Sequence, residues 1–162
     1  MTRKIKRIYV DASAVLGLFD PHEIRRQQTE RFWQAVKDGR IIAIISDVLD
    51  SELKEGSKDL VYEFLASLPE SQVQWVELTT AAIDLTEQYI ESKVIGRANL
   101  NDCRHVALAT IHKADGIVSW NMRDMVKREK RYNKINKKLG YSKIVITTTH
   151  RYKDIIYGTK ND

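Results

Sequence analysis

The sequence predicts a three-layer α/β domain in which a five-stranded parallel sheet is flanked by helices. Short apolar runs of strand length alternate with longer stretches of helical period along the chain. Strands separated by helices pair in parallel through right-handed crossovers, which place helices on both faces of the sheet. Because 162 residues suit one hydrophobic core, we expect residues 1–162 to form a single domain.

Five apolar runs are predicted to be strands, and the amphipathic stretches between them are predicted to be helices. The expected strands are Arg7–Val10, Ile41–Ile45, Val73–Val76, Gly116–Ser119 and Ile144–Ile146. The expected helices are Ile24–Lys37, Asp47–Lys54, Ser57–Leu68, Thr80–Glu91 and Asn99–His112.

Helix start and stop signals agree with these ranges. Asp47, Ser57 and Thr79 or Thr80 are candidate N-caps of the second, third and fourth helices, and Gly39 follows the end of the first. The fifth helix has apolar residues at i, i+3, i+4, i+7 and i+8, namely Cys103, Val106, Ala107, Thr110 and Ile111.

The composition excludes several classes of protein. A hydrophobic content of 43% with 30% charged residues is typical of globular domains, and seven glycines and two prolines argue against collagen-like or linker-rich chains. No apolar run approaches the ~18 residues of a membrane span, and the basic start lacks the apolar stretch of a signal peptide. The single Cys103 cannot form an internal disulfide, so we expect a cytoplasmic protein.

The net charge of +5 is unevenly distributed. Residues 127–138 hold seven bases and one acid, and without them and the N-terminal bases Arg3, Lys4, Lys6 and Arg7 the chain has 16 bases against 21 acids. An acidic body with a basic rim suits a cation site beside a phosphate-binding surface, although a solvated helix face explains the segment as well. The candidate phosphate contacts of this rim are Lys127, Arg128, Lys130 and Arg131.

Acids near the strand ends are the candidate functional residues, because open parallel sheets bind ligands at the carboxyl edge of their strands. Asp11 directly follows the first strand, where a turn or cap residue is the alternative interpretation. Ser13 is placed either to cap the next helix or to reach the same site. Glu52 flanks the apolar stripe of its helix, and an inward carboxylate is costly unless a cation or hydrogen bonds compensate it.

Further candidates come from the fifth helix and the fourth strand. Asp102 lies in the first turn of its helix, where a favourable interaction with the helix dipole is the alternative, and His105 is interpreted as a packing residue. Ser119 is a supporting residue, and either Asn121 or Asp124 would complete the acidic site. Clustered carboxylates raise one another's pKa, and Mg²⁺ or Mn²⁺ would relieve this, with one or two ions promoting phosphodiester hydrolysis.

Four blocks of sequence carry a resemblance to a known family. They are Tyr-Val-Asp-Ala-Ser-Ala-Val at residues 9–15, Ile-Ser-Asp-Val-Leu-Asp-Ser-Glu-Leu at 45–53, Asn-Asp-Cys-Arg-His-Val-Ala-Leu-Ala at 101–109 and Ile-Val-Ser-Trp-Asn at 117–121. In this order and spacing the chain resembles the PIN-domain family, particularly the VapC-type toxins of prokaryotic toxin–antitoxin pairs.

The resemblance implies a metal-dependent endoribonuclease on a five-stranded parallel sheet, with Asp11, Glu52 and Asp102 as catalytic, metal-binding acids. It also implies an RNA substrate, a small antitoxin protein as partner and a homodimer, for which Phe32, Trp33 and Phe64 are candidate apolar contacts. Asn121 stands where many relatives carry Asp, and resembles a subgroup with Ser-Trp-Asn after the fourth strand. Its carbonyl oxygen is expected to face the metal or a bound water.

Other functions are compatible with a parallel α/β domain that has Asp at the end of its first strand. A phosphotransferase with an aspartyl-phosphate needs a second acid two residues after the first, where Ser13 stands, and a receiver-like domain needs an acidic pair before the end of the first strand. The main alternative is a catalytically weak or inactive PIN-like module that binds RNA or a protein. It would keep the fold and the basic rim without metal-dependent cleavage.

Overall fold

The computed structural model describes residues 5–158, which contain one five-stranded sheet. All four pairings are parallel, and the strand order is β3-β2-β1-β4-β5. The predicted parallel sheet is confirmed. The strands are β1 (Lys6–Val10), β2 (Ile41–Ser46), β3 (Val73–Val76), β4 (Gly116–Val118) and β5 (Val145–Thr147).

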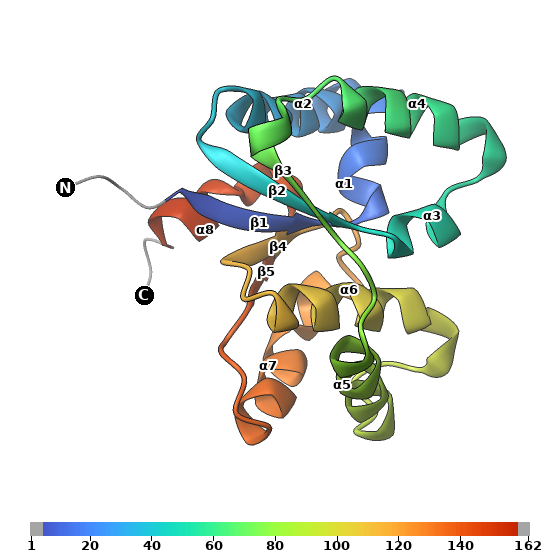
Figure 1. Ribbon diagram of the computed structural model, residues 1–162, viewed down its shortest axis with the longest axis vertical. Helices are drawn as coiled ribbons and strands as arrows, with labels where there is room; N and C mark the ends of the chain where they lie inside the picture. The colour runs from blue at the N-terminus through green and yellow to red at the C-terminus, as the bar shows by residue number, and fades with distance from the viewer. Residues whose placement is uncertain (1–4, 159–162) are drawn as a thin grey trace.

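Helices cover both faces of the sheet, with α2 and α4 on one face and α5, α6 and α7 on the other (Figure 1). The five predicted helices agree with α2 to α6 within two residues, whereas no helix range was predicted for α1, α7 or α8. None of the described helices has the length and apolarity needed to cross a membrane. The helices are α1 (Ala12–Leu16), α2 (Glu23–Lys37), α3 (Val48–Glu52), α4 (Glu55–Ala66), α5 (Thr80–Glu91), α6 (Leu100–Ile111), α7 (Glu129–Lys138) and α8 (Lys153–Tyr157).

The side chains of β1 alternate between two hydrophobic cores, because successive side chains of a strand point to opposite faces of the sheet. Ile8 and Val10 pack with α2 and α4 on one face, and Tyr9 packs with α5, α6 and α7 on the other. All three side chains are buried. The central strand is therefore anchored on both faces, which fixes the position of the residue that follows it.

The helix starts match the cap predictions only in part. The Thr79 hydroxyl accepts a hydrogen bond from the backbone N–H of Ala82 and caps α5 as predicted. Ser57 is not a cap, since α4 begins at Glu55. Asp47 precedes α3, but its carboxylate accepts from the backbone N–H of Leu78 instead of capping that helix.

The strand order reverses at β1, which makes the carboxyl ends of β1 and β4 the switch point of the sheet. Val10 is paired with Val118 in the parallel register. The next residues in the two strands, Asp11 and Ser119, therefore leave the sheet side by side at the switch point.

Candidate functional site

Asp11 is both a helix cap and the centre of the predicted site, so the two interpretations do not exclude each other. Its Oδ1 accepts hydrogen bonds from the backbone N–H of Ala14 (3.0 Å) and from the Ser13 hydroxyl (2.7 Å). Its Oδ2 accepts from the Ser119 hydroxyl at 2.5 Å. Ser13 does not cap α1; it orients Asp11, as Ser119 does.

The buried position of Asp11 makes its negative charge unfavourable. The side chain is 3% exposed, and burial raises the pKa of Asp11, to which the charge of Glu52 adds. The charge of His105 and the two serine hydroxyls act in the opposite direction. A carboxylate in this setting gains from a nearby cation.

Asp102 lies in the first turn of α6 and belongs to the same acidic cluster. Burial is the main cause that raises the pKa of Asp102 from 3.8 to about 6; the charges of Glu52, Asp11 and Asp124 contribute to this rise, and the charge of His105 opposes it. The structure therefore brings together the three predicted acids, which come from three separate segments of the chain.

His105 holds the third acid of the cluster. It is fully buried, its Nε2 is hydrogen-bonded to Glu52 Oε1, and its Nδ1 lies 2.6 Å from the Tyr9 hydroxyl. That hydroxyl in turn lies 2.7 Å from Ser46 Oγ. Burial works against a charged imidazole, yet the hydrogen bond and charge of Glu52 raise the pKa of His105.

The interpretation of His105 as a packing residue therefore missed its polar role. Both of its ring nitrogens have partners, and one of these partners is an acid of the predicted site. The available signal was its i+3 spacing from Asp102, which places both side chains on one face of α6.

Asn121 does not present its carbonyl oxygen as the sequence analysis expected. Its Oδ1 accepts a hydrogen bond from the backbone N–H of Asp124 (3.1 Å), and its Nδ2 donates to Asp102 Oδ1 (3.2 Å). Because a backbone N–H can only donate, this contact fixes the orientation of the amide. The residue thus orients Asp102, while the Asp124 carboxylate lies 4.0 Å from Arg128 Nε.

The fit of the cluster to a divalent cation follows from its donor atoms. Mg²⁺ and Mn²⁺ prefer carboxylate oxygens, and Asp102 Oδ2 accepts no hydrogen bond from residues 5–158. In that same part of the chain, however, no three or more His, Cys, Asp or Glu side chains are arranged to hold a metal ion. Asp11 and Asp102 suit such an ion by their chemistry, whereas Glu52 is engaged by His105.

The first residues of the basic segment 127–138 lie next to the acidic cluster. Lys127, Lys130 and Arg131 are exposed, but Arg128 is half-buried and donates from Nη1 to the carbonyl oxygen of Val94 at 2.7 Å. Arg128 therefore has a structural contact that its charge alone did not indicate.

Of the N-terminal bases, Lys6 and Arg7 are described, and they stand at the opposite end of β1 from Asp11, contrary to the expected position beside the acids. Arg3 and Lys4 lie outside the described residues. Arg7 binds the Gln74 side chain and the carbonyl of His112, and it stands near the start of β1, whereas Asp11 follows the end of that strand.

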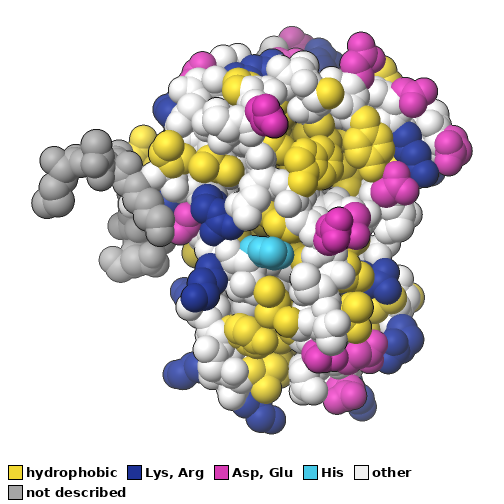
Figure 2. Space-filling view, viewed as in Figure 1, with side chains coloured by type: hydrophobic (Ala, Val, Ile, Leu, Met, Phe, Trp, Pro, Cys, Tyr) yellow, Lys and Arg dark blue, Asp and Glu magenta, His cyan; other side chains and the backbone are white. Residues whose placement is uncertain are grey.

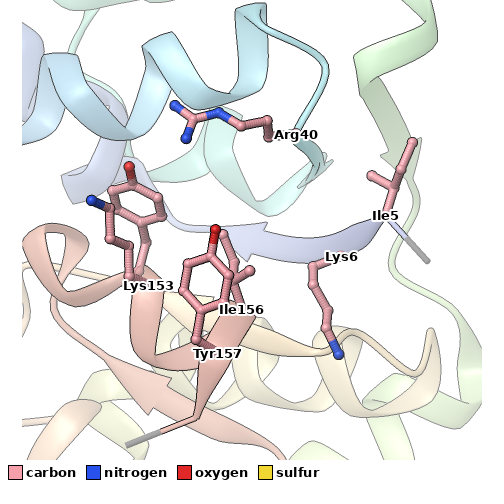
Figure 3. A pocket seen from close by; sticks show the side chains of 7 residues that line it. Ile5, Lys6, Arg40, Lys153, Ile156 and Tyr157 are labelled. Carbon is pink, nitrogen blue, oxygen red and sulfur yellow. The ribbon is translucent and has the colours of Figure 1, made fainter. Parts of the chain in front are cut away.

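A hollow of about 480 Å³ also lies near the start of β1, next to α8 (Figure 3). It contains apolar side chains and three bases but no carboxylate, so its chemistry differs from that of the acidic cluster. Its lining residues are Ile5, Lys6, Arg40, Tyr152, Lys153, Ile156 and Tyr157.

Trp120 braces the loop after β4, a role that the sequence analysis did not assign. Its backbone N–H donates to Ser13 Oγ (2.8 Å), and its indole Nε1 donates to Thr29 Oγ1 (3.0 Å). The indole ring stacks on His150 at 5.4 Å, and the Arg25 guanidinium lies 5.1 Å from its centre. These contacts tie the site to α2.

Comparisons with known proteins agree with this architecture. No protein-family model matches the chain, and no curated protein matches it. The sarcin–ricin loop cleaving toxin VapC20 of Mycobacterium tuberculosis has a TM-score of 0.49 and 14% identity, over 85% of this chain and 98% of that one. A chain of VapBC2 from Rickettsia felis, determined bound to a DNA fragment from its promoter, has a TM-score of 0.55 and 12% identity, over 86% and 96%. The second likeness shows the PIN-like fold of VapC proteins.

Proposed function

We propose that this chain is a divalent-metal-dependent endoribonuclease of the PIN-domain family that acts as the toxin of a toxin–antitoxin pair. One observation carries the proposal: Asp11, Glu52 and Asp102 meet at the carboxyl edge of the sheet, where the pKa values of Asp11 and Asp102 are raised. Such a cluster is unfavourable without a cation and suits hydrolysis of a phosphodiester.

The residues of the cluster have separate roles in this proposal. Asp11 and Asp102 would hold the Mg²⁺ or Mn²⁺ ion. Glu52, which is hydrogen-bonded to His105 through Oε1, would contribute its other carboxylate oxygen. The bound ion would supply positive charge and promote the attack of water on phosphorus. Ser13 and Ser119 would keep Asp11 oriented through the hydrogen bonds described above.

Cleavage of an RNA pool with Mn²⁺ or with chelator tests the proposal. We expect cleavage with metal and none with chelator, and the Asp11→Asn variant should lose cleavage because it lacks the central charge while keeping its shape. Asp84→Asn, which changes an exposed acid on α5, is the matched control and should retain full activity. Full cleavage in chelator, or by a folded Asp11→Asn protein, would place the chemistry elsewhere.

An antitoxin and a second copy of the chain are the proposed partners, and VapBC2 is a relative in fold whose name denotes a toxin–antitoxin pair. The expected apolar contacts were wrong, because Phe32 and Trp33 are buried and Phe64 packs edge-on against Trp33. Hydrophobic side chains instead gather between α4 and the edge strand β3 (Figure 2), where Trp75 is 54% exposed. Sedimentation that shows only monomer at micromolar concentration would exclude the homodimer.

A PIN-like module without catalytic activity is the second candidate. The hydrogen bond between Glu52 and His105 favours it, because this bond leaves only two carboxylates for a cation. RNA binding that persists in Mn²⁺ without any cleavage would support the module and contradict the nuclease.

A further inference from the structure

Helix α7 carries its bases on two different faces. Tyr132 and Asn136 are buried in the core. Arg131, Lys134 and Lys138, at a spacing of three and four residues, line a hollow of about 480 Å³ between α7 and the end of α5. Lys130 and Lys137 are exposed on the helix but do not line this hollow. Its lining residues are Ser92, Lys93, Val94, Arg131, Lys134, Ile135 and Lys138.

The hollow has fixed walls. Lys93 has a positive φ of 57°, which turns the chain sharply after α5, and the backbone N–H of Val94 donates to the carbonyl of Tyr89 (3.0 Å). On the opposite side, Arg128 donates to the carbonyl oxygen of Val94 and so ties the start of α7 to this turn. The left-handed conformation of a lysine persists only where the surrounding structure requires it.

Four cations line the hollow and no acid does: Lys93, Arg131, Lys134 and Lys138 face one space above the apolar side chains of Val94 and Ile135. Like charges that face each other repel, and an anion between them relieves the repulsion. The chemistry of the hollow therefore suits a phosphate chain whose sugars contact the apolar floor.

The row of cations begins at the acidic cluster. Arg128 Nε lies 4.0 Å from Asp124 Oδ1. The backbone N–H of Asp124 donates to Asn121 Oδ1, and Asn121 Nδ2 donates to Asp102 Oδ1. From there Arg131, Lys134 and Lys138 continue outward along α7, which is about 15 Å long for its ten residues.

We propose that the α5–α7 groove, defined by the seven lining residues above, binds the phosphate backbone of single-stranded RNA next to the bond that is cut. This inference rests on the proposed function and names the path of its substrate. It divides the basic segment into a face that contacts RNA and a face that contacts solvent. An acidic protein segment is the competing occupant, but it would not need a row of cations that leads to the acids.

A pair of double variants tests the groove. Lys134→Gln/Lys138→Gln removes two groove charges, and Lys137→Gln/Lys143→Gln removes two exposed charges outside it. Binding of a labelled single-stranded RNA is measured by fluorescence anisotropy in chelator at several salt concentrations, so that no cleavage is involved. The loss of two phosphate contacts should reduce the slope of log K against log salt by about 1.4, and the affinity about tenfold at 0.15 M salt.

The matched variant should keep the slope of the unmodified protein, and both variants should keep its melting temperature. Equal slopes for the two variants would overturn the groove. A groove variant that binds RNA normally but no longer binds an acidic antitoxin would also overturn the proposal. If the groove variant shows the expected loss and the protein does not cleave RNA with Mn²⁺, the groove stands and the nuclease proposal fails.

Discussion

Replacing Asp102 with Asn should stabilise the protein in the absence of metal. Asp102 is half-buried beside two other acids, so that burial and their charges raise its pKa to about 6. Asn has nearly the same shape and keeps an oxygen that can accept the hydrogen bond from Asn121 Nδ2. The variant therefore removes an unfavourable charge with little change in packing.

The size of the effect follows from the pKa. A rise from 3.8 to about 6 corresponds to ~3 kcal/mol at neutral pH, and solvent screening of a half-buried group reduces this to about 1–2 kcal/mol. For a chain of this size, such a gain in the free energy of unfolding raises the melting temperature by about 3–6 °C. Since the folded-state pKa is raised, the stability that Asp102 contributes is fully present below pH 3.8 and is lost as the pH rises through about 6.

Thermal unfolding at pH 4 and pH 7.5, in chelator and in Mn²⁺, checks this prediction. In chelator the variant should melt above the unmodified protein at pH 7.5 and at the same temperature near pH 4. Mn²⁺ should stabilise the unmodified protein more than the variant, because the variant lacks one of the two charges that suit the ion. A variant that melts below the unmodified protein at pH 7.5 in chelator would refute the reasoning, and Asp84→Asn should not respond to pH in this way.

Two further substitutions test the bracing and the charge of the site. Gly17→Ala would place a methyl group 2.5 Å from Thr29 Oγ1 and 2.9 Å from Trp120 Nε1. It should therefore lower the free energy of unfolding by about 1–3 kcal/mol, as measured by urea denaturation. An unchanged denaturation midpoint would contradict this. Asn121→Asp would replace a hydrogen-bond donor to Asp102 with a negative charge. It should therefore lower the melting temperature in chelator and strengthen Mn²⁺ binding in calorimetry. If Mn²⁺ binding is unchanged in this variant but is lost in Asp124→Asn, the metal site lies at Asp124.

The carboxyl edge of the sheet could be predicted from the sequence because strand ends are marked by local patterns. Asp11 and Ser119 each follow an apolar run, and parallel register places the ends of these runs together. Ser13, which the sequence placed either as a helix cap or beside Asp11, donates its hydroxyl to Asp11. These positions depend on the backbone alone, which explains why they could be predicted from the sequence.

The hydrogen bonds of the site depend on contacts between distant segments and could not be predicted. Asn121 turns its amide because the backbone N–H of Asp124 points at it, and no pattern of residue types encodes that direction. Phe32 and Trp33 were misplaced for a similar reason, because residues distant in sequence cover them: Phe32 packs against Tyr152, and Trp33 packs against Phe64. The indole of Trp33 donates to the carbonyl of Ala14 inside the core.

The contacts of the four central residues bear on how many ions the free protein would hold. Glu52 already has a partner in His105, and Asn121 contributes a donor where a fourth acid would add a negative charge. Of the three acids, Asp11 and Asp102 are then the two that no cationic side chain of residues 5–158 contacts by a hydrogen bond, and together they match the charge of one divalent ion. Under the proposed function, a second ion would need additional negative charge, which an RNA phosphate would supply. We therefore expect one ion in the free protein and a second ion only with RNA bound.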